Sequence, residues 1–110
     1  MVRMRSERHF DIIYAPTVRG HLQVIERKYH SLIRSAIETQ LRFEPDVEAR
    51  NRKPLRRPGI WEADWEIRFG PGNRFRVFYE VDRPVRQVYI LAIGEKRGNR
   101  LLIGGEEVEL

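Results

Sequence analysis

Cysteine is absent from the 110-residue sequence, so the chain can form neither disulfides nor thiolate-ligated metal sites. No apolar run reaches the about 20 residues that a membrane-spanning helix requires. The basic N-terminus, MVRMRSERHF, is not followed by the apolar stretch of a secretory signal peptide. We therefore expect a cytoplasmic protein without a membrane segment.

Clusters of metal-ligating residues are missing as well. The chain has three histidines, and neither these nor the carboxylates are clustered at the spacings that metal sites use. We therefore expect a protein with no metal ion and no small-molecule cofactor.

Acidic residues are too few to balance the basic ones: 16 Asp and Glu stand against 21 Lys and Arg, which gives a net charge of +5. A sequence pI of about 10.1 biases a small domain towards nucleic acid or an acidic protein. The composition, 41% hydrophobic and 34% charged, is typical of one globular domain over residues 1–110. Because surplus charge can also serve solubility alone, its position along the chain has to decide between these roles.

The N-terminal part of the chain shows two patterns of hydrophobic residues, one typical of a strand and one typical of helix. In residues 9–14, HFDIIY, alternating apolar residues predict a short strand. Residues 17–43 repeat apolar side chains at helical spacing after an N-cap residue, Thr17, and Pro45 ends this stripe. The period fits either one long helix or two packed helical segments.

A connection and a meander follow. Residues 44–64 are interrupted by prolines and contain the basic run RNRKPLRR, residues 50–57. Residues 65–94 alternate over three segments with turns at GPGN and DRPV, which predicts three antiparallel strands. The tail has room for a short strand at residues 101–103. This order predicts an α+β fold with the helices on one face of an antiparallel sheet and the other face open.

The alternation on both sides of the GPGN turn determines which residues face one another. Placing the apolar side chains on the helix-packed face sets Arg68 directly opposite Arg76 on the open face. Like charges so placed are destabilising by up to about 1 kcal/mol. Either Glu66 or Glu80, diagonal on the same face, or an anion from outside could neutralise them, and a solvated charged face is the remaining alternative. The register pairs Phe69 with Phe75, Ile67 with Val77 and Trp65 with Tyr79.

The third strand adds a further cation by the same reasoning. Its alternation extends one face to Arg97, and if this is the open face, Arg97 joins Arg68 and Arg76 across three neighbouring strands. We expect the basic run to fold over the rim. The other residues expected on the Arg97 face are Tyr89, Leu91 and Ile93. The residues expected in the core are Trp65, Ile67, Val77, Tyr79, Ile90, Leu22 and Ile33.

The C-terminal half, LRRPGIWEADWEIRFGPGNRFRVFYEVDRPVRQVYILAIGEKRGNR, resembles the RelE/ParE superfamily, the toxins of type II toxin–antitoxin modules. The family pattern is a leucine with a basic residue and a turn, a strand W-E-(I/L)-R, a Gly-rich turn, a strand R-(V/L)-x-Y-x-V-D, and a closing strand whose Gly precedes Lys or Arg. The residues before this half agree with the family in the order of strand and helices. The matching parts are residues 55–57, 65–68, 70–73, 76–82 and 93–97.

This resemblance implies a RelE-like fold: an N-terminal strand, a two-helix hairpin, and an antiparallel sheet of three or four strands with the helices on one face. RelE-like members are metal-independent endoribonucleases that cut messenger RNA in the ribosomal A site, whereas ParE-like members poison DNA gyrase. Both are held inactive by a cognate antitoxin, whose acidic, partly disordered segment wraps the toxin. The expected partners are therefore an acidic antitoxin and either mRNA on the ribosome or DNA gyrase.

The resemblance also implies a phosphate-binding site. In RelE-like nucleases, the positions matching Arg68, Arg76 and Arg97 bind the scissile phosphate and stabilise its developing charge. Glu66 occupies another basic position of the family's first sheet strand, and it acts either as the base or only as a neutraliser of the arginines. The further cations expected on the RNA are Arg50, Arg52, Lys53, Arg56, Arg57, Arg74, Lys96 and Arg100.

One catalytic group of the family is missing, because the tail RLLIGGEEVEL contains neither tyrosine nor histidine. His21 and His30 fall in the predicted helices, where we expect solvated side chains, and His9 stays an outside candidate at the start of a strand. Three functions remain open: an mRNA endoribonuclease, a non-catalytic toxin that binds gyrase, and an inactive module that only binds its antitoxin. The basic positions favour the nuclease.

Overall fold

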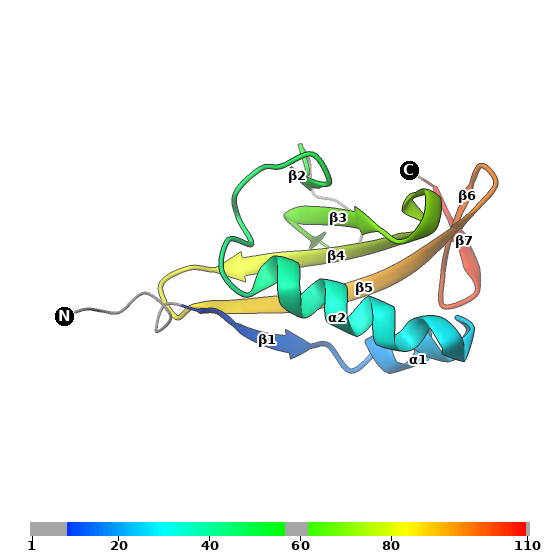
Figure 1. Cartoon of the computed structure of the whole chain (residues 1–110), viewed down its shortest axis with the longest axis horizontal. Helices are drawn as coiled ribbons and strands as arrows, with labels where there is room; N and C mark the ends of the chain where they lie inside the picture. The colour runs from blue at the N-terminus through cyan, green and yellow to red at the C-terminus, as the bar shows by residue number, and fades with distance from the viewer. Residues whose placement is uncertain (1–8, 57–61, 110) are drawn as a thin grey trace.

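A seven-stranded sheet with its helices on one face forms the described part of the chain, residues 9–56 and 62–109 of the computed structural model (Figure 1). The order across the sheet is β2-β3-β4-β5-β6-β7, with antiparallel neighbours, and β1 pairs in parallel with β5. The predicted α+β class is confirmed. The elements are β1 (Asp11–Tyr14), α1 (Val18–Gln23), the 3-10 turn η2 (Arg27–Tyr29), α2 (His30–Leu41), β2 (Arg52–Pro54), β3 (Trp65–Phe69), the 3-10 turn η4 (Pro71–Asn73), β4 (Phe75–Asp82), β5 (Gln87–Arg97), β6 (Arg100–Ile103) and β7 (Glu106–Val108).

The long helical stripe is two helices, as the resemblance implied. Glu26, with an extended backbone (ψ 134°), separates α1 from η2 and α2. In Figure 1, α2 crosses in front of β4 and β5, and its residues Ile33, Ile37 and Leu41 are buried. The apolar face of α2 therefore closes one side of the sheet.

The main core lies between the helices and the sheet. Five of the seven predicted core residues are at most 1% exposed, and burial of such a side chain contributes about 1.5–3 kcal/mol. Trp65 and Leu22 are only half-buried and pack against the edge of this core. The five buried residues are Ile33, Ile67, Val77, Tyr79 and Ile90.

Three short strands extend the predicted meander. β2 lies within the predicted connection 44–64 and pairs with β3, and the tail forms a β6–β7 hairpin where only a strand at 101–103 was expected. Gly104 and Gly105 form its turn with φ of 62° and 85°, which glycine adopts readily. Alternation did not reveal β2 and β7 because each has only three residues, most of them polar.

The strand β5 carries a bulge that the alternation did not predict. The register shifts between Phe78 and Tyr79, which leaves Leu91 as an extra residue of β5. Ile93 consequently lies opposite Val77 in the helix-side core. The prediction that one face holds Tyr89, Leu91, Ile93 and Arg97 is therefore wrong.

The face opposite the helices is less open than predicted. A second buried cluster lies on it, where Phe78 of β4 and its neighbour on β5 meet Leu101 and Ile103 of β6. Gly94 lets β6 come this close, because a Cβ at Gly94 would lie 2.9 Å from Leu101 Cδ1. Since Gly94 pairs with Arg76, this apolar cluster borders the charged residues of the face.

Candidate phosphate-binding face

Two arginines lie directly opposite each other on the face away from the helices, as predicted. Arg68 on β3 pairs with Arg76 on β4. Glu66 Oε2 lies 3.3 Å from Arg68 Nε and 3.6 Å from Arg76 Nη1. Glu66, rather than Glu80, is therefore the diagonal neutraliser, and one carboxylate shared by two guanidinium groups leaves a surplus positive charge.

Burial makes this surplus charge costly. Arg76 is 6% exposed and Glu66 7%, whereas the side chain of Arg68 is 43% exposed. Arg76 Nε has no hydrogen-bond partner, and its guanidinium makes no ion pair in the described chain besides the 3.6 Å contact with Glu66. Desolvation, followed by the charge of Arg68, lowers the pKa of Arg76, and Glu66 opposes this. An anion bound beside Arg68 would reduce the repulsion between the arginines.

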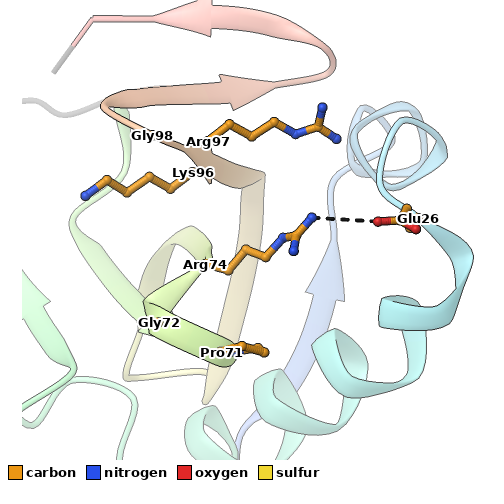
Figure 2. A pocket seen from close by; sticks show the side chains of 7 residues that line it. All are labelled: Glu26, Pro71, Gly72, Arg74, Lys96, Arg97 and Gly98. Carbon is orange, nitrogen blue, oxygen red and sulfur yellow. Dashed lines mark ion pairs between the residues drawn. The ribbon is translucent and has the colours of Figure 1, made fainter.

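Lys96, rather than Arg97, extends this face onto β5. Beyond the bulge, Gly94 pairs with Arg76, and Lys96 pairs with a residue of the second cluster, so Lys96 shares the face of Arg76. Lys96 is exposed, and no described residue forms an ion pair with it. Figure 2 shows its side chain extending away from that of Arg97. The charged face is hereafter the set Glu66, Arg68, Arg76 and Lys96.

Arg97 and Arg74 lie on the helix side, where they share a buried carboxylate. Glu95, 3% exposed, accepts Arg74 Nε at 2.6 Å and Arg97 Nη2 at 3.3 Å on its two oxygens. Arg74 also donates to the Tyr29 hydroxyl at 3.2 Å and lies 3.7 Å from Glu26. The hydrogen bond to Glu95 raises the pKa of Arg74. The structure therefore ties Arg74 into the fold and separates Arg97 from the charged face.

The basic run at residues 50–57 does not act as one unit. Arg52 donates to the backbone oxygens of Val47 at 3.0 Å and Gln40 at 2.9 Å, so it holds the C-terminal end of α2. RNA would have to compete with these two backbone oxygens for the guanidinium of Arg52. Lys53 pairs with Glu66 across β2 and β3, which places it at the border of the charged face.

The remaining cations expected on RNA are spread over the surface. Arg50 and Arg56 are exposed, and Arg57 lies outside the described residues. Arg100 is exposed, with its Nη1 3.6 Å from Glu107. Of the seven predicted RNA-binding residues that the structure describes, it brings only Lys96 onto the charged face and Lys53 to its border.

The expectation of solvated helix histidines is wrong for His21, which is 7% exposed. Its Nδ1 accepts the backbone N–H of Ile93 at 3.2 Å, and burial lowers its pKa. The signal was in the sequence, since His21 stands four residues before Ile25 on the apolar stripe. The Nε2 of His30 lies 2.9 Å from the backbone oxygen of Ile25. These contacts place His21 and His30 on the helix side, away from the charged face.

Within residues 9–56 and 62–109, no group of three His, Cys, Asp or Glu side chains could hold a metal ion. Over the same residues, no helix is long and apolar enough to cross a membrane.

The arrangement of strands and helices recurs in a solved structure. No family model and no curated protein matches the sequence. A chain of the RelBE2 toxin–antitoxin complex from Mycobacterium tuberculosis matches with a TM-score of 0.65 and 22% sequence identity, over 80% of this chain and 99% of that chain. The protein has a RelE-like fold. The fold that the resemblance implied is thus confirmed, and in this RelE-like fold the charged face is the side of the sheet that the helices leave uncovered.

Proposed function

We propose that the protein is the toxin of a type II toxin–antitoxin module and that it cleaves messenger RNA on the ribosome. The charged face carries this proposal, because Arg68, Arg76 and Lys96 lie on three neighbouring strands with one carboxylate, Glu66, among them. The RelE-like fold supports the toxin assignment. Guanidinium forks in this arrangement suit a phosphodiester.

The chemistry uses the RNA's own nucleophile. The 2′-hydroxyl attacks the adjacent phosphorus, the bond to the 5′-oxygen breaks, and the products are a 2′,3′-cyclic phosphate and a 5′-hydroxyl. Negative charge grows on the non-bridging oxygens, where the exposed Arg68 can bind. Arg76, held by β4 beneath it, adds a fixed positive charge. A preorganised donor of this kind contributes about 3 kcal/mol to stabilising the transition state.

Proton transfer is the weaker part of this mechanism. A base must reach the 2′-hydroxyl and an acid must reach the leaving oxygen. Glu66 is the carboxylate of the charged face, but its Oε2 is already engaged by Arg68 and Arg76. Electrostatic stabilisation therefore dominates, and Glu66 serves chiefly to keep the two arginines compatible before RNA binds.

The acidic antitoxin fits a groove on the helix side. This groove, about 820 Å³, lies between β1, α1 and α2, with Ile33 and Ile37 in its floor. The Tyr14 hydroxyl in it is buried and has no hydrogen-bond partner among the described residues. The exposed cations Arg19 and Arg34 lie at its rim. An amphipathic acidic segment would fill the floor, bond Tyr14 and neutralise the rim. It would then have to extend around the sheet to cover the charged face.

A non-catalytic toxin that binds DNA gyrase is the second candidate. It is favoured by the tail, which has neither tyrosine nor histidine, and by the engagement of Glu66 with the arginines. Both observations weaken acid–base catalysis without weakening a basic binding surface.

The test is induced expression without the antitoxin, followed by mapping of message ends on ribosomes. The parent should arrest growth and cut messages, and Arg76→Met should lose both while keeping a normal unfolding transition, because methionine preserves most of the buried volume. Arg27→Met, an exposed cation on η2, is the matched control and should stay toxic. Growth arrest with intact messages and altered DNA supercoiling would replace the nuclease with the gyrase-binding toxin. No arrest from folded protein would leave the inactive antitoxin-binding module.

A further inference from the structure

A basic hollow lies at the end of the sheet, next to the charged face. It forms where the β3–β4 turn and the β5–β6 turn approach the segment before η2, and its volume is about 630 Å³ (Figure 2). That size falls in the range of about 300–1,000 Å³ that suits a nucleotide-sized ligand. The hollow is hereafter the site lined by Glu26, Pro71, Gly72, Arg74, Lys96, Arg97 and Gly98.

One wall of the hollow is rigid. Arg74 is fixed by Glu95, by the Tyr29 hydroxyl and by the Tyr29 ring, whose centroid lies 4.7 Å from the guanidinium carbon. In Figure 2 its side chain reaches across the hollow to Glu26. This anchoring gives the hollow a positive group whose position costs no further ordering when a ligand binds.

The opposite wall offers donors that the fold does not use. Arg97 makes one hydrogen bond, at 3.3 Å to Glu95, and its side chain is 52% exposed. Lys96 has no ion pair with any described residue. Because they are consecutive on β5, Lys96 and Arg97 point to opposite sides of the sheet, as Figure 2 shows. The hollow therefore connects the charged face with the helix side.

Two glycines keep the hollow open to a ligand backbone. Gly72 and Gly98 have φ of 61° and 62°, and a Cβ at either position would meet no atom within 4 Å. Glycine is therefore required by the turn conformation and not by crowding. Its missing side chain leaves the peptide units of both turns accessible to a phosphate.

We propose that this hollow is a second phosphate site, which binds the phosphodiester next to the one on the charged face, so that single-stranded RNA bends over the end of the sheet. Lys96 lies between the two phosphates, and Arg97 binds the second. The inference rests on the proposed nuclease function, since it adds a neighbouring nucleotide to the same substrate. Three lining cations against Glu26 and the buried Glu95 leave a net positive charge, which favours phosphate over a cationic or neutral ligand.

The test compares Arg97→Gln and Arg68→Gln in the full chain, with a labelled 2′-O-methyl RNA that cannot be cleaved and is long enough to span both sites. Arg97→Gln should weaken binding about threefold to tenfold and reduce the slope of log affinity against log salt by about 0.7, the share of one phosphate on a single strand. For a dinucleotide with one phosphodiester, Arg97→Gln should leave the NMR-measured affinity at the parent value, whereas Arg68→Gln should lower it. Arg27→Gln is the control and should match the parent with both ligands.

Each other outcome has a defined meaning. If Arg68→Gln weakens RNA binding and Arg97→Gln does not, the second site is refuted and the charged face stands. If neither substitution matters, the proposed function fails as well. If inorganic phosphate or a mononucleotide shifts the Gly72 and Gly98 amide signals while Arg97→Gln leaves RNA binding unchanged, the hollow binds free phosphate compounds and the RNA path is overturned.

Discussion

Arg76 is a buried cation whose ion pair and hydrogen bonds are incomplete. Arginine is seldom buried unless it is fully paired, yet its 3.6 Å contact with Glu66 is too long for a hydrogen bond and its Nε has no partner. A buried ion pair of this quality adds little to stability, and an apolar group of similar volume is often equally stable. An anionic ligand beside Arg68 would offset the positive charge that Glu66 leaves unbalanced at Arg76.

Replacing Glu66 by glutamine should separate its two candidate roles. The substitution removes the carboxylate that contacts both Arg68 and Arg76 while keeping its shape, so single-stranded RNA should bind about threefold to tenfold more tightly. The free energy of unfolding should fall by about 1–3 kcal/mol, because buried Arg76 loses its charged partner. If Glu66 is only a neutraliser, message cleavage persists in Glu66→Gln; if Glu66 is the base, cleavage is lost although binding improves.

Glu80→Gln is the matched control for this prediction, since Glu80 lies on the same face of β4 farther from the arginines. It should leave RNA affinity unchanged in fluorescence anisotropy and urea unfolding unchanged in circular dichroism. Equal RNA affinity of the parent and Glu66→Gln would contradict the assignment of Glu66 as the internal counter-ion.

At the scale of strands and helices, local alternation predicted the β3–β4 hairpin, and the structure reproduces its register pair by pair, including Arg68 opposite Arg76. The same reasoning failed on β5 because Leu91 is inserted there, and one extra residue moves every later side chain to the other face. A bulge depends on the partner strand and leaves no mark in the alternation itself. This single residue decides that Lys96, not Arg97, joins the charged face.

The spacing of residues along the chain also could not predict side-chain contacts between elements that are distant in the sequence. Arg52 looks like one cation of a basic run, but it donates to the backbone oxygen of Gln40 in the last turn of α2. His21 looks like a helix-surface residue, but it accepts the backbone N–H of Ile93 and joins α1 to β5. Both side chains find partners that only the tertiary arrangement brings near, whereas the stripe of apolar residues on α2 follows from its own spacing.

The α1–β5 contact at His21 should make stability depend on pH. Burial lowers the pKa of His21 below its ordinary value of 6.5, so the unfolded chain binds the proton first as the pH falls. The stability of this contact is thus fully present above pH 6.5 and is lost as the pH decreases below it. His21→Gln keeps an acceptor for the Ile93 N–H and should flatten this part of the urea-midpoint profile between about pH 7.5 and pH 5.

The other titrating groups are held constant by this comparison. Glu95 and Arg97 line the same small cavity as His21 and are present in both proteins. Identical pH profiles of the parent and His21→Gln would show that His21 does not titrate on unfolding.

On the scale of the whole molecule, the basic surfaces and the apolar groove differ in character. The charged face and the basic hollow carry cations whose side chains are exposed or half-exposed, namely Arg68, Lys96 and Arg97. The helix side carries an apolar groove with a basic rim. A net charge of +5 biases both surfaces towards polyanions, but only the groove adds an apolar floor and an unpartnered hydroxyl. We expect RNA to select the first surface and an acidic protein segment the second.

Charge reversal at the groove rim should therefore affect the antitoxin and spare the RNA. Arg19 is exposed on α1 and lines the groove, so Arg19→Glu should weaken binding of the proposed acidic antitoxin about tenfold, because one attraction becomes a repulsion next to the partner's carboxylates. The same variant should bind single-stranded RNA with nearly the parent's affinity and salt dependence, since Arg19 belongs neither to the charged face nor to the lining of the basic hollow. Arg27→Glu carries the same charge change outside the groove and should retain antitoxin binding. Isothermal titration of the purified pair measures the first effect and fluorescence anisotropy the second; if Arg19→Glu and Arg27→Glu weaken antitoxin binding equally, net charge and not the groove directs the partner.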